Sequence, residues 1–330
     1  MGQKQLETLQ IEKQKAKLSF RLELNNLNFL TKFLSSLPNN LQGAFWLASS
    51  VFAFTAMATL AKYLGNDFHA FQIAFFRSFF SLIVIMPFLI RAGAEQGGVK
   101  TQVPLLQVVR GTVSALGIMM GFYAIVNMPL ADAQAIRFSS SLFLVPLAAI
   151  FLKERIGIRR TLATLVGFTG VLIMLNPDSE YNLASFMALG AAFAFAFAAI
   201  LVNIVSKYDK PVTLMFYSNI ISVLIMIVPA LLFWETPDGQ QLVLIFIMAI
   251  CASIAHNFFI RAYAIGEASV IAPIDYIRLL FSAAVDFLIF GIIFGINTLI
   301  GSAIIILTTL YILRREAKVK KGNKTNLEEI

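Results

Sequence analysis

From residue 42 onward the chain alternates apolar runs of roughly twenty residues with short polar breaks, and this alternation limits the possible folds more than any other feature. An α-helix of ~20 apolar residues is just long enough to cross the hydrocarbon core of a bilayer. Only 13% of the residues are charged, whereas soluble domains carry about 25%. The sequence therefore predicts an all-α integral membrane protein.

The polar breaks divide the chain into about ten predicted transmembrane helices. We predict them at 42–61, 70–90, 104–126, 130–151, 160–175, 183–206, 212–233, 242–262, 269–294 and 297–313. Residues 1–41 form a predicted cytoplasmic tail, either disordered or an amphipathic helix on the membrane surface, and 314–330 form a basic cytoplasmic tail. Residues 1–38 lack the compact apolar core of a cleavable signal peptide.

Basic residues are distributed unequally between alternate loops. Of the 26 Lys and Arg, twelve lie in the tails, eight lie in one set of alternate loops, and only Lys62 lies in the opposite set. The positive-inside rule then places both termini in the cytoplasm of a multi-pass protein of the cell (inner) membrane. Topology accounts for the net charge of +8, so we expect the lipid bilayer, and no nucleic acid, as the partner of this charge.

The chain also repeats itself. Segment 123–143 resembles segment 263–284, and the alignment pairs Gln134, Arg137 and Ser141 with Asp275, Arg278 and Ser282. Segment 75–87 resembles 216–229, which pairs Arg77 with Asn219. We expect a first repeat at 42–176 and a second at 177–313. Because each holds five spans, the second is inserted upside down, and inverted repeats of this kind are typical of secondary transporters.

The ninth span carries charges that lipid does not tolerate. Asp275, Arg278, Ser282 and Asp286 fall within an arc of about 80° on a helix, and one charge in a span costs at least ~2.5–3.5 kcal/mol. This stripe should therefore face the bundle interior. Asp275 and Arg278 either line a substrate path or form a structural ion pair. Asp286 is protonated, pairs with another helix, or titrates during transport.

Further polar residues complete the predicted substrate path. Span eight carries His256 and Asn257; His256 is either a satisfied interior histidine or a proton relay, and Arg77 of span two either lines a cavity or pairs structurally. Arg110 lies near the end of span three, where snorkelling is expected. The predicted path consists of Arg77, Gln134, Arg137, Ser141, Asn219, His256, Asn257, Asp275, Arg278, Ser282 and Asp286.

Several classes of function are excluded or disfavoured. The single cysteine and two histidines, without an HExxH motif, predict no disulfide, metal site or other cofactor. An intramembrane enzyme would need paired acids or metal motifs in its loops, and a channel a continuous polar pore, and neither is evident. There is no P-loop, so proton or exchange coupling is expected.

Two pairs of glycines have the spacing of close helix packing. Gly117 and Gly121 lie four residues apart, as do Gly291 and Gly295. Small residues at this spacing allow the backbones of neighbouring membrane helices to approach one another. We therefore predict a close helix contact at each pair.

Four stretches carry a resemblance to a known family: FFRSFFSLIVIMP, VVRGTVSALGIMMGFYAIVNMPLADAQAI, FLKERIGIRRTLATLVGFTGVLIMLNP and APIDYIRLLFSAAVDFLIFG. Together they resemble the drug/metabolite transporter superfamily, specifically its ten-span EamA-type members, and the second is similar to the S-adenosylmethionine uptake group. The chain departs from the family where an acidic residue usually ends the fourth span of each repeat, because Glu154 is kept but Ile292 stands at the second place.

The resemblance implies a secondary transporter and no enzyme. Its expected substrate is a small amphipathic metabolite, such as an amino acid or a compound like S-adenosylmethionine, moved by alternating access. Export of drugs or other metabolites is the alternative within the same family.

Overall fold

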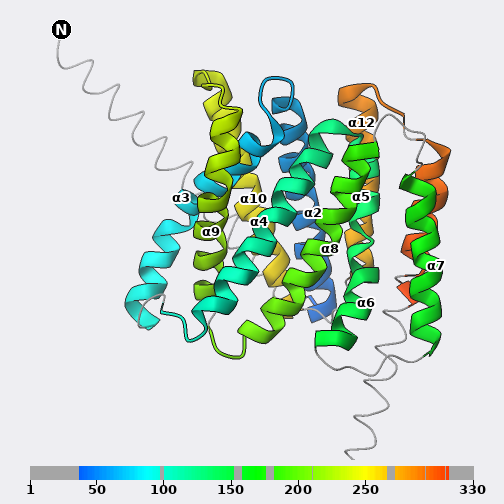
Figure 1. Cartoon of the computed structure of the whole chain (residues 1–330), viewed down its shortest axis with the longest axis horizontal. Helices are drawn as coiled ribbons and strands as arrows, with labels where there is room; N and C mark the ends of the chain where they lie inside the picture. Colours follow the sequence, from blue (N-terminus) through cyan, green and yellow to red (C-terminus); the bar gives the residue numbers. More distant parts are fainter. Residues whose placement is uncertain are drawn as a thin grey trace, which may run out of the picture.

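The computed structural model describes residues 37–96, 100–151, 158–175, 182–209, 211–265, 272–293, 295–308 and 310–311, and the regular elements within them are all helical (Figure 1). They are α2 (Asn39–Leu64), α3 (Ala70–Gln96), α4 (Pro104–Asn127), α5 (Leu130–Arg137), α6 (Ser140–Phe151), α7 (Ile158–Leu175), α8 (Asn182–Val205), α9 (Pro211–Leu232), α10 (Gly239–Ile265), the 3-10 helix η1 (Ala272–Tyr276) and α12 (Ile277–Phe290). A last apolar helix follows at Ile296–Thr308.

These helices confirm the predicted membrane architecture. Within the described residues, six helical stretches are long and apolar enough to cross a membrane, and three shorter apolar helices join them. The ninth span ends at Phe290, earlier than predicted, because Gly291 adopts a left-handed conformation (φ 65°) that terminates α12. Most of the two tails and Glu154 lie outside the described residues.

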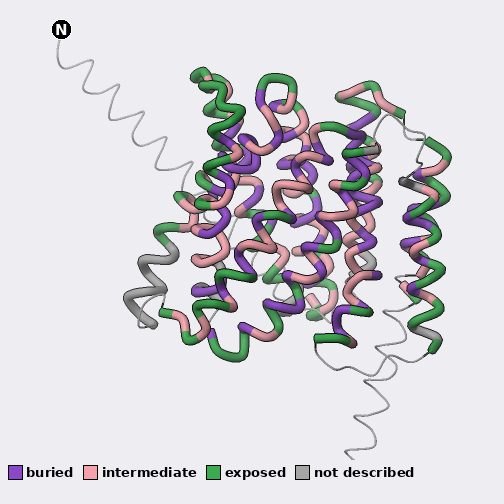
Figure 2. The backbone as a smooth tube through the Cα atoms, in the orientation of Figure 1, coloured by how far each residue is buried: buried purple, intermediate pink, exposed green. Residues whose placement is uncertain are grey.

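The surface of the bundle is apolar. Large hydrophobic side chains such as Leu172, Leu231 and Leu288 (77% exposed) point outward, and buried residues concentrate toward the inside (Figure 2). Soluble monomers rarely expose apolar surface on this scale. Such a surface is suited to contact lipid.

Helix contacts between the two halves occur in matched pairs. The first helix of one half packs on the third helix of the other, as α2 on α10 and α8 on α4. The second helix does the same, as α3 on α10 and α9 on α4. An inverted repeat produces this exchange of partners, whereas the limits 42–176 and 177–313 stay a prediction.

The glycine pairs have different outcomes. A Cβ at Gly117 would lie 3.1 Å from the Cβ of Ala194 on α8, so the close approach of α4 and α8 is confirmed. The structure shows no such contact at Gly291 and Gly295, because no atom of the described residues lies within 4 Å of a Cβ added at either. Gly291 terminates a helix instead.

Span four is interrupted by a turn, and span nine changes from a 3-10 helix to an α-helix between Tyr276 and Ile277, although the sequence predicts continuous helices. The turn at Phe138–Ser139 separates α5 from α6, and η1 precedes α12. At the first interruption the hydroxyl of Ser141 donates to the carbonyl of Phe138 (2.8 Å), and such bonds compete with the regular helix ladder. The irregular backbone lies within about one turn of Arg137 and of Arg278 in the two spans.

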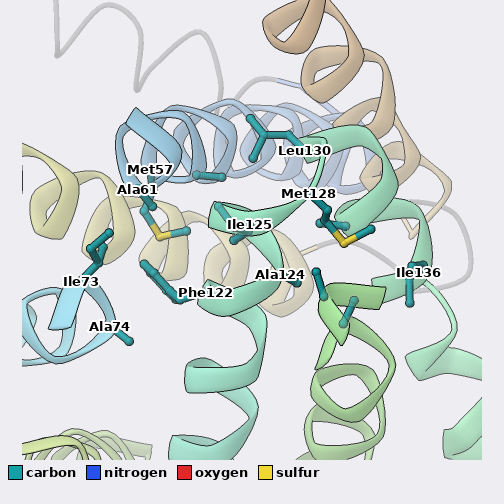
Figure 3. Close-up of a cluster of buried hydrophobic side chains, with 14 of the residues drawn as sticks. Met57, Ala61, Ile73, Ala74, Phe122, Ala124, Ile125, Met128, Leu130 and Ile136 are labelled. Carbon is teal, nitrogen blue, oxygen red and sulfur yellow. The ribbon is translucent and has the colours of Figure 1, made fainter. Parts of the chain in front are cut away.

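Apolar packing fixes the helices around these interruptions. One large cluster of buried side chains includes Met57 and Ala61 of α2, Phe122 of α4, and Leu130 and Ile136 of α5 (Figure 3). Met128, in the link between α4 and α5, belongs to the same cluster. The second half of span one and the first half of span four are thereby held together at one end of the bundle, which we call the Lys62 end; the opposite end is the Asp209 end.

Candidate substrate site

The polar stripe of α12 faces the interior, as its spacing predicts. Arg278, Ser282 and Asp286 are buried, whereas Leu280 and Leu288 on the same helix are exposed. Arg278 is only 2% exposed, and its Nη2 lies 2.6 Å from Oδ1 of Asp275 in η1. The predicted contact of these two residues is therefore present, while its role stays a prediction.

Arg137, from the other half of the chain, lies near this ion pair without forming an ion pair of its own with Asp275. It is half-buried at the end of α5 and interacts electrostatically with both Arg278 and Asp275. We call these three residues the two-arginine cluster. With two guanidinium groups and one carboxylate, the cluster holds one more positive charge than negative.

Aromatic rings surround the two-arginine cluster. The guanidinium carbon of Arg278 lies 4.8 Å from the ring centre of Phe54 on α2, and that of Arg137 lies 5.9 Å from the ring centre of Phe195 on α8. Both distances allow cation–π attraction. The rings of Phe138 and Tyr276, 4.8 Å apart, connect the two interrupted spans.

Several buried polar atoms near the interruptions lack a hydrogen-bond partner among the described residues. They are Oε1 of Gln134, the hydroxyls of Ser139 and Ser282, and Nε of Arg278. Buried polar groups normally have partners. These atoms are therefore available to water or to the polar groups of a ligand.

The other predicted path residues lie in different places. Arg77 is half-buried on α3, and its Nε has no hydrogen-bond partner among the described residues, whereas the nearby His256 is exposed on α10. Asn219 is half-buried on α9, and Asn257 is exposed on α10. The hydroxyl of Ser141 donates a hydrogen bond to the backbone carbonyl of Phe138.

Asp286 contacts another helix, as one of the alternatives from the sequence expects, while its part in transport stays a prediction. Its Oδ1 lies 3.7 Å from Nζ of Lys62 on α2, and its Oδ2 accepts a hydrogen bond (2.8 Å) from the N–H of Ala131 in the first turn of α5. Lys62 also donates to the carbonyl of Met128 (2.7 Å). The nearby carboxylate of Asp132 accepts a hydrogen bond (2.5 Å) from Thr298.

Sequence reasoning missed the role of Lys62 and Asp132. A signal was present, because Lys62 is the one basic residue in the loops expected outside and Asp286 has no partner within its own span. Two isolated opposite charges in an apolar chain are candidates for forming an ion pair with each other. We call Lys62, Asp132, Asp286 and Thr298 the Lys62 cluster.

A buried network closes the Asp209 end. Asp209, after α8, accepts hydrogen bonds from the hydroxyl of Thr101, the N–H of Gln102 (3.0 Å) and Nε2 of Gln107 (2.8 Å). Arg110 donates to Oε1 of Gln107 (2.9 Å) and to the carbonyl of Leu214 (2.6 Å). Arg110 is buried, so the predicted snorkelling is wrong: protein acceptors satisfy the guanidinium in place of water.

The charge of Asp209 is stabilised by this network. Burial by itself would raise its pKa, but the hydrogen bonds from Thr101, Gln102 and Gln107, together with the nearby Arg110, outweigh burial and lower the pKa of Asp209. The carboxylate is thus ionised at neutral pH and holds the start of α4 against the link between α8 and α9.

A similar but weaker contact exists at the Lys62 end. Nε2 of Gln241, at the start of α10, donates to Oδ2 of Asp67 (3.1 Å) in the link between α2 and α3. In the repeat alignment that pairs Arg77 with Asn219, Asp67 corresponds to Asp209. Each half therefore uses an aspartate after its first helix to bind a glutamine at the start of the other half's third helix.

A shallow cavity of about 470 Å³ opens at the Lys62 end, lined by Gly65–His69 and Leu232–Glu235. The ring of His69 stacks on Phe233 at 3.9 Å, and burial lowers the pKa of His69. None of the predicted path residues lines this cavity. Among the described residues, no group of three or more His, Cys, Asp or Glu is arranged to hold a metal ion.

Comparison with known proteins identifies the family. The model of the EamA-like transporter family matches residues 41–176 and again 182–314. An S-adenosylmethionine uptake transporter of Rickettsia felis is 33% identical over 284 residues, which cover 86% of this chain and 96% of the relative. A riboflavin transporter of Vibrio cholerae is 30% identical over 86% of this chain and 97% of the relative.

More distant matches agree on the fold and on the class of protein. The pseudopaline exporter of Pseudomonas aeruginosa is 27% identical over 82% of this chain and 94% of the exporter. A solved crystal structure has a TM-score of 0.57 at 16% identity and covers 84% of this chain and 99% of that chain. The family and these named relatives are transporters and not enzymes. The chain belongs to the EamA-like transporter family, in the drug/metabolite transporter superfamily.

Proposed function

We propose that this protein is a secondary transporter that takes up S-adenosylmethionine, or a closely similar amphipathic α-amino acid, by alternating access. The family supports transport of a small molecule, and the similarity to uptake transporters of S-adenosylmethionine over most of the chain supports this substrate. Riboflavin is the competing cargo, because a riboflavin transporter is 30% identical.

The observation that carries the proposal is the excess positive charge of the two-arginine cluster. Arg137 and Arg278 come from equivalent positions of the two halves; Arg278 pairs with Asp275, and Arg137 lies nearby without a carboxylate of its own among the described residues. The carboxylate of an amino acid would compensate the second guanidinium, and Arg binds carboxylates through paired hydrogen bonds. S-adenosylmethionine has this carboxylate, whereas riboflavin has none.

The rest of the substrate fits the surroundings of the cluster. The faces of Phe54 and Phe195 are already next to the guanidinium groups, and aromatic faces also attract a sulfonium or stack on an adenine ring. The free oxygen of Gln134 and the hydroxyl of Ser282 offer hydrogen bonds. The interrupted backbone of spans four and nine is the type of structure that lines binding sites in transporters.

The proposal includes an orientation in the membrane and a source of energy. The Asp209 end faces the cytoplasm with both termini, because the basic loops lie on that side, and the Lys62 end faces outward. Without a P-loop, movement is driven by exchange or by a proton gradient. The equivalent contacts Asp67–Gln241 and Asp209–Gln107 at opposite ends suit a carrier that closes one end at a time.

Counterflow in proteoliposomes tests the proposal. Vesicles loaded with unlabelled S-adenosylmethionine, with riboflavin or with individual amino acids receive a trace of the labelled compound outside. Wild type is compared with Arg278→Ala and with Arg261→Ala, which removes an exposed arginine of α10. We expect accumulation of S-adenosylmethionine by wild type and Arg261→Ala, and about a ten- to hundredfold loss in Arg278→Ala, the effect of one charge-assisted hydrogen bond.

The outcomes separate the parts of the proposal. Accumulation of riboflavin but not S-adenosylmethionine would reject the substrate. Equal accumulation by Arg278→Ala and wild type would reject the two-arginine cluster as the site and make the ion pair structural. Size-exclusion profiles and melting temperatures of the purified variants show whether each is folded.

A further inference from the structure

The Lys62 cluster joins four segments that are distant in the sequence. Lys62 lies in the last turn of α2, the Met128 carbonyl and the Ala131 N–H belong to the α4–α5 connection, and Asp286 lies near the end of α12. Thr298, in the last helix, donates to Asp132 in the first turn of α5. Charges and backbone groups thus hold spans one, four, nine and ten together at the Lys62 end.

This junction is dry. Asp286 is 0% exposed and the side chain of Lys62 is 10% exposed. Ala61, Met128 and Leu130, which are part of or adjacent in the chain to the contacting groups, belong to the large apolar cluster, with exposures of 3% or less (Figure 3). Oδ1 of Asp286 has no hydrogen-bond partner among the described residues besides its ion pair with Lys62. A substrate that entered from this end would have to separate these groups.

One rigid helix connects this junction with the two-arginine cluster. Arg278, Ser282 and Asp286 share the buried face of α12 at i, i+4 and i+8, so Arg278 and Asp286 lie ~12 Å apart along the axis. The helix is bounded by η1 at one end and by the left-handed Gly291 at the other. A tilt of α12 on binding at Arg278 would therefore displace Asp286 as well.

The junction has no counterpart in the other half of the chain. The alignment that pairs Arg137 with Arg278 places Val145, a buried apolar residue, at the position equivalent to Asp286. The Asp209 end is closed instead by the network of Asp209, Gln107 and Arg110. Within the described residues, an ion pair of this kind therefore occurs at the Lys62 end and not at the Asp209 end.

We propose that Lys62, Asp286 and the first turn of α5 form the outer gate of the transporter, and that α12 couples opening of this gate to substrate binding at Arg278. The gate rests on the proposed function for its orientation and its substrate. The ion pair holds the outer end closed, and the substrate path lies directly below it, at Ser282. Weakening the ion pair shifts the carrier toward an outward-open state.

A cysteine below the gate measures this shift without any transport. Cys251 is the single cysteine, so Cys251→Ser with Ser282→Cys leaves one thiol, one turn of α12 below Asp286. A charged, membrane-impermeant methanethiosulfonate reagent is added outside right-side-out vesicles. Lys62→Met and Asp286→Asn are compared with the intact gate. In Asp286→Asn, the new side-chain amide would keep an oxygen for the Ala131 N–H, so that the substitution removes only the ion pair.

Lys207→Met is the matched control. Like Lys62, Lys207 is followed by a tyrosine and lies near the end of the first helix of its half, but it is exposed and lies at the Asp209 end. We expect both gate variants to react about tenfold faster than the intact gate, as a shift of the open population would produce. Lys207→Met should react like the intact gate. Two gate variants make the test independent of whether one of them fails to fold.

Fast labelling with the intact gate, or unchanged labelling in folded Lys62→Met and Asp286→Asn, would overturn the gate. Coupling is tested by adding S-adenosylmethionine before the reagent: the labelling rate should rise with the intact gate and not after Arg278→Ala, whereas a fall, as shielding of the thiol by substrate would produce, would overturn the coupling. No change would overturn the coupling. If counterflow fails for every compound but the gate variants still label faster, the proposed substrate fails and the gate stands.

Discussion

At the scale of single residues, buried charges in this bundle are compensated by different groups. Arg278 has Asp275 and the face of Phe54, Asp286 has Lys62 and a backbone N–H, and Arg110 has Gln107. An unpaired charge in such surroundings is strongly destabilising. Arg137 lies near Asp275 and Arg278 but has no ion pair of its own among the described residues, and the proposed function therefore places the carboxylate of the substrate next to it.

Asp209 gives a prediction for pH. Its folded pKa is lowered below the ordinary value of 3.8, so the folded state binds fewer protons than the unfolded state in this range. The stability that its hydrogen bonds contribute is present above the unfolded pKa and is lost as pH falls through the folded pKa. Between about pH 5 and about pH 3, the melting temperature of wild type should therefore fall more steeply than that of Asp209→Asn.

Thermal unfolding in detergent at a series of pH values measures this difference. Glu235→Gln, which changes an exposed carboxylate, is the control and should follow wild type. Parallel curves for wild type and Asp209→Asn would contradict the assignment of the Asp209 network as a stabilising contact.

At the scale of elements, small residues decide how closely helices approach. A Cβ added at Gly117 would lie 3.1 Å from the Cβ of Ala194, whereas one added at Gly121 would lie 3.8 Å from the Cβ of Ala191. The same spacing at Gly291 and Gly295 reflects a helix end and not an interface. The G-x-x-x-G pattern alone does not distinguish these cases.

The α4–α8 contact is tested by two substitutions on one helix. Gly117→Leu should lower the free energy of unfolding by about 1–3 kcal/mol, because a larger side chain in a filled interface forces the backbones apart. Gly121→Ala adds a methyl group at ordinary contact distance and should leave stability within about 0.5 kcal/mol. Thermal unfolding in detergent measures both. Equal effects would show that α4 and α8 do not approach one another as described.

At the scale of the whole molecule, the paired helix contacts and the two aspartate–glutamine contacts describe a protein built from two similar halves with exchanged partners. The differences between the halves are as informative as the similarities. A buried ion pair holds the Lys62 end, and a hydrogen-bonded network holds the Asp209 end. In the proposed mechanism, these unequal contacts would let one end open while the other stays closed.

The orientation makes a prediction for labelling of whole cells. In a Cys251→Ser background, Asn127→Cys places an exposed thiol at the Lys62 end and Lys207→Cys places one at the Asp209 end. An impermeant maleimide should label Asn127→Cys on intact cells and Lys207→Cys only after permeabilisation. The reverse pattern would invert the proposed topology and move the gate to the cytoplasmic side.

The sequence by itself determined that the chain lies in a lipid bilayer, how many spans it has, and which face of α12 points inward. These follow from local rules: about twenty apolar residues are needed to cross a bilayer, and charges on one face of a membrane helix must avoid lipid. The correspondence of Arg137 and Arg278 could also be found in the sequence, because the two repeats can be aligned residue by residue.

Only the tertiary structure decided which charges meet. Lys62 and Asp286 are separated by more than two hundred residues in the chain, and their contact depends on how α2, α5 and α12 pack. The partner of Arg110 and the interruptions of spans four and nine depend likewise on neighbours and on backbone hydrogen bonds. Periodicity tells which face of a helix is buried, but the identity of the atoms on the other side of that face is a property of the packed bundle.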